Sequence, residues 1–360
     1  MKSAKFVFQK TSLLLFALFV LTSCLCTSCG APSFLPEQNE NNGQAPSNDL
    51  PANTVPQEPE PILHYNPYTG LVCDEESVSY RPISICIGNF DNKIQNGLSF
   101  ADILIEAPVP SGETRLWALT TSWQQASLFS SVSSVRDYMM PISKSLHAIS
   151  VFYGSNDRSQ STEADKGDCL DLSALSQSSG YWQEGTSIYA SKECLEGAIS
   201  AAGYSLTLQN PALPYLFCEP KASISPQGNP ISTVKIRYGV GKEALFSYDK
   251  NTMTYQGKKN GEYYGINQEG TPLSFANVLV LFHNVTQYDS ENDSYFTLDA
   301  EAGGSGYCYT GGGVIRITWQ YENEQGLVFR MENGEKLTLN RGKTYISMMK
   351  VTESTGVIAK

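Results

Sequence analysis

Histidine is scarce in this sequence, and the short motifs that mark several enzyme classes are missing. Only three histidines occur in 360 residues, His64, His147 and His283, and none belongs to an H-x-x-x-H or H-E-x-x-H arrangement. A zinc hydrolase would therefore lack its usual ligand spacing. The sequence also contains no G-x-S-x-G nucleophile elbow, no P-loop and no G-x-G-x-x-G segment after a strand. We therefore expect no metal and no cofactor.

No long apolar run occurs near the N-terminus. The apolar run from Leu13 to Leu21 has nine residues, which is too short to cross a hydrocarbon core of about 30 Å as a helix. Lys2, Lys5 and Lys10 precede this run. A short apolar run after a few positive charges is typical of a secretory signal peptide and not of a membrane span.

The apolar run ends in Leu21-Thr22-Ser23-Cys24, which resembles the lipobox of bacterial lipoproteins. This resemblance implies a signal peptide over residues 1–23, cleavage before Cys24, and a lipid on Cys24 that anchors the protein to the outer side of the cell membrane. Cys29 is a second candidate for the lipidated residue. An ordinary secretory cleavage further along the chain is the alternative.

Acidic residues outnumber basic ones in the expected mature chain as a whole. Removing residues 1–23 leaves 22 basic and 36 acidic residues, a net charge of −14. This excess argues against nucleic acid as a partner and is compatible with a cationic or neutral envelope component. Residues 24–61 are rich in Pro, Asn, Gln and Glu and poor in large apolar residues, a composition that predicts a disordered tether.

The nine cysteines do not form a zinc motif. Six of them are isolated in the expected folded part, and the one C-x-x-C pair, Cys26 and Cys29, lies in the tether. Disulfides are possible in an exported protein, but six cysteines allow fifteen full pairings and the sequence does not choose among them. Cys86 and Cys308 lie in strand-like runs, so we expect both to be small buried hydrophobic residues.

Strand and helix signals predict an α+β fold with two parts. Residues 62–215 contain strand-like runs alternating with helical segments at 137–147 and 192–202, which predicts an α/β domain with a mixed sheet. Residues 230–352 contain many short strand-like runs separated by Gly, Asn and Asp, which predicts a β-rich domain. The glycines at 303, 304 and 306 lie among these runs and are expected to make turns and not to bind phosphate.

A hairpin near residue 108 carries most of the polar residues of interest. Alternation from residue 101 to 107 places Asp102, Leu104 and Glu106 on one face of a strand. If the hairpin is symmetric about its Pro- and Gly-containing turn, Glu106 stands opposite Arg115. The pair is then either a cross-strand ion pair that fixes the register, contributing about 0.2–1 kcal/mol, or the floor of a polar binding site.

Six short motifs follow one another in a fixed order along the chain. They are Asn66-Pro-Tyr-Thr-Gly-Leu71, Arg81-Pro-Ile-Ser-Ile85, Gly97-Leu-Ser-x-Ala-Asp102, Gly112-x-Thr-Arg115, Ser134-Val-Arg136 and Gly304-Ser-Gly-Tyr307. This series resembles the YerB-like family of bacterial lipoproteins, a domain family of unassigned function. The resemblance runs from about residue 66 to about 350 and implies an N-terminal α/β portion followed by a β-rich C-terminal portion. Two family positions differ here: Ser133 replaces an arginine and Thr186 replaces a histidine.

These observations favour a binding or scaffolding lipoprotein without catalytic residues. The hypothesis places an anionic or glycan envelope ligand, or an envelope protein, in a polar cleft, because arginine suits carboxylate and phosphate groups. The alternative is an envelope glycan or peptide hydrolase that uses Glu106 as its acid/base. The expected ligand-binding residues are Asp102, Glu106, Arg115, Ser134, Arg136 and Tyr189.

Overall fold

The computed structural model describes the folded part of the chain in ten segments. They are residues 62–89, 95–109, 113–154, 167–176, 181–208, 214–266, 270–287, 296–298, 302–322 and 325–360. These segments belong to a compact unit from Glu60 to Lys360, which is distinct from Met1–Pro59. The predicted signal peptide, lipidated Cys24 and tether therefore lie outside the described residues.

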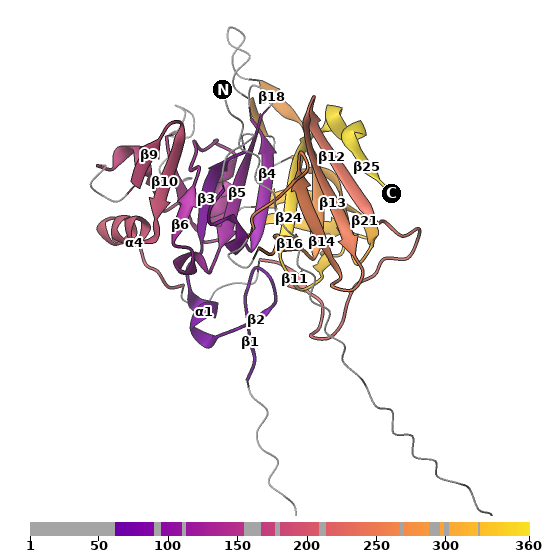
Figure 1. Ribbon diagram of the computed structural model, residues 1–360. Coiled ribbons are helices and arrows are strands. Elements are labelled where there is room, and N and C mark those ends of the chain that lie inside the picture. The colour runs from indigo at the N-terminus through magenta and orange to yellow at the C-terminus, as the bar shows by residue number, and fades with distance from the viewer. Residues whose placement is uncertain are drawn as a thin grey trace, which may run out of the picture. The chain divides into compact units, whose positions relative to one another are not determined.

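A ten-stranded mixed sheet takes strands from both halves of the chain (Figure 1). In spatial order the strands are β22 (Gly326–Met331), β21 (Gly313–Glu322), β20 (Gly304–Thr310), β17 (Asn277–His283), β24 (Thr344–Lys350), β4 (Ile103–Pro108), β5 (Thr114–Thr120), β3 (Ile83–Gly88), β7 (Ile149–Phe152) and β8 (Cys169–Asp171). The centre of the sheet is the parallel pairing of β24 with β4, and β17 with β24, β3 with β7 and β7 with β8 are also parallel. Strands near residue 100 and near residue 345 therefore share one sheet.

A second, antiparallel sheet is formed entirely by the C-terminal half. In its strand β13 (Lys242–Asp249), Ala244 and Phe246 are buried and Ser247 is exposed. This alternation is typical of an antiparallel sheet with one face on the core and the other in solvent. In order, its strands are β15 (Glu262–Tyr263), β14 (Thr254–Lys259), β13 (Lys242–Asp249), β12 (Thr233–Gly239) and β25 (Val357–Ala359), with β16 (Ser274–Phe275) paired to β14.

Smaller sheets and short helices complete the described residues. The three-stranded sheet has the order β6 (Leu128–Ser130), β10 (Ser187–Ser191), β9 (Tyr181–Glu184). The two-stranded pairs are β1 (His64–Tyr65) with β2 (Val72–Cys73), β11 (Leu216–Phe217) with β23 (Thr338–Leu339), and β18 (Val285–Gln287) with β19 (Phe296–Leu298). The helices are α1 (Glu75–Ser79), α2 (Met139–Ser145) and α4 (Lys192–Ala201), with 3-10 turns at Leu98–Phe100, Trp123–Gln125, Leu172–Ala174 and Val351–Gly356.

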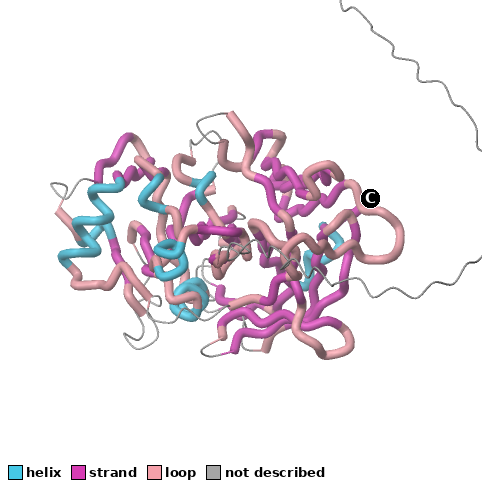
Figure 2. The backbone as a smooth tube through the Cα atoms, turned by 90° about the horizontal axis from the view of Figure 1, so that it is seen from below, coloured by secondary structure: helices cyan, strands magenta, loops and turns pink. Residues whose placement is uncertain are grey.

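The fold is mostly β with few helices, and it confirms the α+β class with a mixed sheet and a β-rich C-terminal part. Figure 2 shows most of the helical segments gathered over one half and strands dominating the other. Helix α4 begins as the sequence predicts, because the Ser191 hydroxyl accepts a 3.2 Å bond from the Cys194 amide and caps the first turn. Helix α2 buries Met139, Met140 and Ile142, so one face of this helix is apolar.

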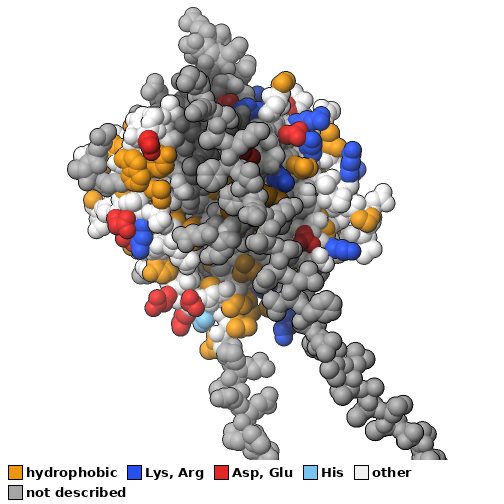
Figure 3. All heavy atoms as spheres, in the orientation of Figure 1, with side chains coloured by type: hydrophobic (Ala, Val, Ile, Leu, Met, Phe, Trp, Pro, Cys, Tyr) orange, Lys and Arg blue, Asp and Glu red, His pale blue; other side chains and the backbone are white. Residues whose placement is uncertain are grey.

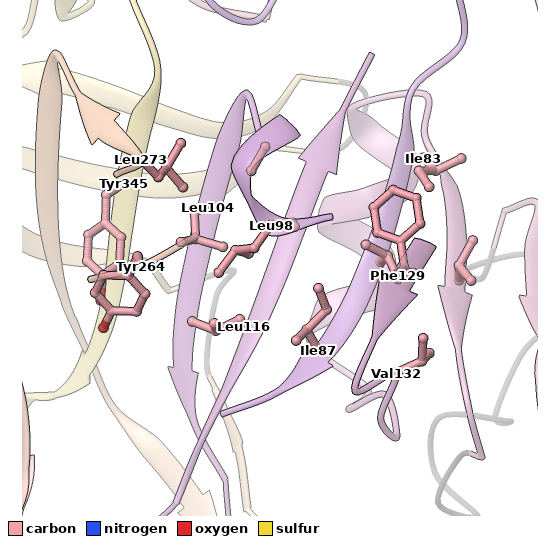
Figure 4. Packing of buried hydrophobic residues seen from close by; sticks show 14 of the residues in the cluster. Ile83, Ile87, Leu98, Leu104, Leu116, Phe129, Val132, Tyr264, Leu273 and Tyr345 are labelled. Carbon is pink, nitrogen blue, oxygen red and sulfur yellow. The ribbon is translucent and has the colours of Figure 1, made fainter. Parts of the chain in front are cut away.

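Hydrophobic cores lie on both faces of the large sheet. One cluster joins Leu104 and Leu116 of the sheet to Phe246 of the antiparallel sheet and Leu195 of α4. Figure 4 shows Leu104, Leu116 and Ile87 of this cluster on neighbouring strands, together with Tyr264 and Tyr345, which belong to the same cluster.

The second cluster lies on the opposite face, against α2. It contains Ile105, Trp117 and Met140. Cys86 and Cys308 are fully buried here, as predicted. The six cysteines among the described residues are all free thiols.

Candidate functional site

Glu106 is the most enclosed of the predicted site residues, with only 1% of its surface exposed. It lies in β4, whose six residues are all buried, and it stands opposite Ser347 of β24. The side chain therefore sits where the strands of the N-terminal half meet those of the C-terminal half. A carboxylate in such a place is costly unless hydrogen-bond donors surround it.

Four donors surround the Glu106 carboxylate. Oε1 accepts bonds from Asn89 Nδ2 at 2.9 Å and Thr114 Oγ1 at 2.8 Å. Oε2 accepts bonds from the hydroxyls of Tyr264 at 2.6 Å and Tyr345 at 2.7 Å. Because a carboxylate offers about four acceptor positions, this arrangement uses the acceptor capacity of both oxygens.

A chain of hydroxyl groups extends from the carboxylate into the C-terminal half. The Tyr238 hydroxyl lies 2.8 Å from that of Tyr345 and 2.6 Å from Ser347 Oγ. Each hydroxyl has a single hydrogen, so if Tyr345 donates to Glu106, then Tyr238 donates to Tyr345 and Ser347 donates to Tyr238. Burial, and secondarily the charge of Glu106, raises the pKa of Tyr345 and Tyr238 well above the ordinary value. These phenols therefore stay protonated and act as donors.

This geometry makes Glu106 a structural acceptor that ties four segments together. An acid/base must reach a proton on its substrate directly or through one water, whereas both Glu106 oxygens face donors from the protein itself. The arrangement gives no support to the hydrolase alternative.

The expected pairing of Glu106 with Arg115 is wrong. In the β4–β5 hairpin Glu106 stands opposite Leu116, and Arg115 stands opposite Ala107. The register is shifted by one residue from the symmetric arrangement, and such a shift moves a side chain to the other face of the sheet. Glu106 therefore shares the face of Leu104, while Arg115 shares that of Trp117.

Arg115, Ser134 and Arg136 are brought together on the face opposite Glu106. Arg136 Nη1 donates to Ser134 Oγ at 3.3 Å and to the Val135 carbonyl at 3.1 Å. Its Nε is buried and has no hydrogen-bond partner among the described residues. Burial lowers the pKa of Arg115, which is 8% exposed, and the nearby charge of Arg136 lowers it further. Two guanidinium groups thus lie close enough to repel one another.

Asp102 occupies a separate position, just before the other end of β4. Its Oδ2 accepts bonds from the Thr121 amide at 2.7 Å and the Thr121 hydroxyl at 2.8 Å. Burial raises the pKa of Asp102, and the charge of Lys343 opposes that effect. At the strand rise per residue, Asp102 is about 13 Å from Glu106, so the two carboxylates do not form an acid/base pair.

Tyr189 belongs to the three-stranded sheet and not to the large sheet that carries Arg115. Its ring stacks on Trp182 with centroids 5.2 Å apart and an angle of 8° between planes. The two residues are cross-strand neighbours in the β9–β10 hairpin. Tyr189 therefore forms an aromatic surface pair instead of joining the polar residues of the large sheet.

No local pattern marks Asn89, Tyr264 and Tyr345 as partners of Glu106. Asn89, Tyr264 and Tyr345 are 17, 158 and 239 positions away from it. The chain contains 20 tyrosines, so residue type alone could not single out those at the junction. Among the described residues, no group of three or more His, Cys, Asp or Glu is arranged to hold a metal ion, and no helix is long and apolar enough to cross a bilayer.

The family of the chain follows from two matched domains. Residues 68–205 match the N-terminal domain and residues 234–346 the C-terminal domain described as "Protein of unknown function (DUF3048)". The chain belongs to the DUF3048 family. Strands from both DUF3048 domains form the ten-stranded sheet, and the Glu106 cluster lies where they join.

Two comparisons with proteins from Bacillus subtilis agree with this membership. The chain is 27% identical over 298 residues to "Putative lipoprotein YerB" of strain 168, covering 79% of this chain and 85% of that protein. It also resembles the crystal structure of the Bacillus subtilis YerB protein, with a TM-score of 0.72, 24% identity, and coverage of 82% of this chain and 99% of that one. The second likeness shows a shared fold, and together they confirm the resemblance inferred from the motifs.

Proposed function

We propose that this DUF3048 protein is a lipid-anchored envelope protein that binds an anionic ligand, or an anionic group of a partner, through Arg115, Ser134 and Arg136. The observation that carries the proposal is that half-buried Arg136 lies close enough to buried Arg115 to lower its pKa, while Arg136 Nε lacks a hydrogen-bond partner among the described residues. Asp102 and Glu106 have structural roles in this proposal.

An anion would relieve an unfavourable arrangement at this place. Two nearby guanidinium groups disfavour each other's charged form, which is why the pKa of Arg115 is lowered by Arg136 as well as by burial. Arginine presents planar forks of donors that match carboxylate and phosphate oxygens. A bound carboxylate or phosphate would therefore offset the repulsion and bond the free Nε–H of Arg136.

Anchoring is supported by the sequence of the N-terminus and by the name of a relative. Leu21-Thr22-Ser23-Cys24 resembles a lipobox, and the relative from Bacillus subtilis is named as a lipoprotein. Replacing Cys24 with Ala should move the protein from the membrane fraction of cells to the soluble extracytoplasmic fraction. Retention of Cys24→Ala in the membrane fraction would instead assign the anchoring to Cys29 or to an uncleaved signal peptide.

Anion binding is tested by thermal unfolding with inorganic phosphate as the probe, against chloride at equal ionic strength. Phosphate should raise Tm of the wild-type protein, because a ligand at ten times its Kd stabilises the folded state by about 1.4 kcal/mol. The Arg136→Gln variant should lose this phosphate-specific rise. Arg316→Gln should keep it, because the Arg316 side chain is 74% exposed and lies 3.9 Å from Glu332.

The phosphate-dependent change in Tm is the readout, so a general effect of Arg136→Gln on stability does not affect the comparison. Equal responses to phosphate in the wild type and both variants would contradict the proposed site. Acetate, measured in the same way, distinguishes a site for carboxylates from one for phosphates.

A further inference from the structure

Exposed apolar side chains gather at the point where the chain enters its folded part. Of the eleven large hydrophobic side chains that are exposed among the described residues, five lie on or beside the β1–β2 hairpin and β11. We call these five the basal patch. Figure 3 shows hydrophobic side chains at the lower edge of the molecule, over this hairpin, with acidic side chains over α1 beside them. The basal patch consists of Ile62, Leu63, Leu71, Val72 and Leu216.

The hairpin that carries the basal patch is held firmly to β11 by Arg341. The Arg341 guanidinium donates from Nη1 to the Gly70 carbonyl and from Nε to the Cys218 carbonyl at 2.7 Å. It also lies 4.4 Å from the centre of the Tyr65 ring. One cation thus joins β1, the turn of the hairpin and the segment after β11, which holds the elements that carry the patch in fixed positions relative to one another.

The turn of the hairpin is also fixed from within. Asn66 Oδ1 accepts bonds from the Tyr68 and Thr69 amides at 2.8 and 3.1 Å. Gly70 adopts φ +65°, and a Cβ at this position would lie 2.7 Å from Phe217 Cγ. These contacts keep Leu71 and Val72 exposed, at 46% and 61%, although their burial would be favourable.

The basal patch lies where the predicted tether joins the folded part, and this indicates what covers the patch. The segment from the predicted lipid on Cys24 ends at Ile62, within the patch, and spans 38 residue steps. A flexible segment of this length has a root-mean-square end-to-end distance of roughly 35 Å. An anchored protein would therefore always have a bilayer surface within reach of the patch.

We propose that the basal patch docks on the bilayer, with its aliphatic side chains at the boundary between headgroups and acyl chains. This inference rests on the anchoring in the proposed function. Such insertion is favourable in proportion to the apolar area that is buried. Because the tether keeps the effective concentration of the surface high, weak intrinsic affinity is enough to hold the patch there.

The charges around the patch define the kind of bilayer. Asp74, Glu75 and Glu76 follow β2 directly and form the acidic start of α1. They would be repelled by anionic headgroups at low salt. The patch therefore suits a zwitterionic surface, and anionic lipid should weaken the docking.

Docking is tested with tryptophan reporters on phosphatidylcholine vesicles that contain brominated acyl chains, which quench inserted indoles. The chain from residue 24 onward carries an N-terminal histidine tag in place of Cys24 and is attached through a nickel-chelating lipid. The reporter is Val72→Trp, and the matched control is Val240→Trp, at a fully exposed turn between β12 and β13. Spectra of the protein without either substitution provide the signal of the four native tryptophans.

The fluorescence added at residue 72 should be quenched about twofold or more relative to that added at residue 240, since only an inserted indole reaches the acyl chains. Adding Leu71→Asp to the reporter protein should remove the difference, and adding phosphatidylglycerol at low salt should reduce it. Equal quenching at the two positions would overturn the proposal. The same result is expected if the patch binds a protein and not the bilayer. Because nickel supplies the attachment, this result is independent of whether cells lipidate Cys24.

Discussion

The hydroxyl of Tyr345 donates a 2.7 Å hydrogen bond to Glu106 Oε2, although the two residues are 239 positions apart. They belong to β24 and β4, which pair in parallel at the centre of the large sheet. The bond therefore connects the two DUF3048 domains inside the protein. Because both groups are buried, neither can exchange this partner for water without the junction opening. Loss of the bond should therefore lower the free energy of unfolding.

Glu106→Gln should lower the free energy of unfolding by about 1–3 kcal/mol, because it leaves at least one buried donor without an acceptor. The amide has the size of the carboxylate, but its NH2 group cannot accept bonds from the donors that face it. Urea unfolding at neutral pH measures the loss. Glu196→Gln is the control, because Glu196 forms only a surface pair with Lys192 at 3.7 Å and should change stability by less than about 0.5 kcal/mol. A similar small change for both variants would contradict the structural role of Glu106.

Tyr345→Phe should also destabilise the protein, and its effect should not add to that of Glu106→Gln. Removing the hydroxyl deprives Glu106 of one donor and Tyr238 of one partner. A double-mutant cycle from urea unfolding should give a coupling energy of about 0.5–3 kcal/mol, as expected for groups in one network. Strict additivity would mean that the bond does not link the two residues energetically.

His283 should make the protein less stable in acid. Burial lowers its pKa from 6.5 to about 4 in the folded state, so the unfolded chain takes up the proton first as the pH falls. The contribution of His283 to the free energy of unfolding therefore declines from pH 6.5 towards pH 4, by about 3 kcal/mol in total. His283→Asn should show a weaker decline over this range. The difference in unfolding free energy between the two proteins, measured from pH 7 to pH 4, isolates this residue, and a constant difference would contradict the prediction.

Gly304→Ala should destabilise the protein by about 3 kcal/mol, as expected for strain from overpacking in a core. A Cβ at this position would lie 2.0 Å from the Phe282 carbonyl oxygen, which also accepts a 3.0 Å bond from Trp319 Nε1. Gly197→Ala is the opposite case: it lies inside α4 with no atom within 4 Å, so alanine should stabilise by about 0.5–1 kcal/mol. Thermal unfolding measures the change in stability of each variant, and a change of the same sign in both would contradict the prediction.

The glycine run near residue 304 shows one limit of sequence reasoning. We expected its glycines to make turns, and Gly303, just before β20, has the positive φ of +65° that glycine favours. Gly304, however, begins β20 and is needed for the close approach of another strand. A turn and a close backbone contact require the same residue type, so composition alone does not separate them.

The candidate site shows a second limit. Residue types on one strand correctly placed Leu104 and Glu106 on the same face, but the partner of Glu106 across the hairpin depended on a shift of one residue. Side chains alternate with a period of two, so a shift of one sends Arg115 to the other face. On that face Arg115 lies near Arg136, beside the hydrophobic cluster that contains Trp117.

Local patterns in the sequence determined the class of the fold, the apolar face of α2, the cap of α4 and the buried cysteines, because each depends on neighbouring residues. Membership of the DUF3048 family followed from an ordered series of motifs. Only the tertiary structure decided the partners of Glu106. Tyr345, for example, reaches Glu106 through the parallel pairing of β4 with β24, and pairing between distant strands leaves no periodic signal in either strand.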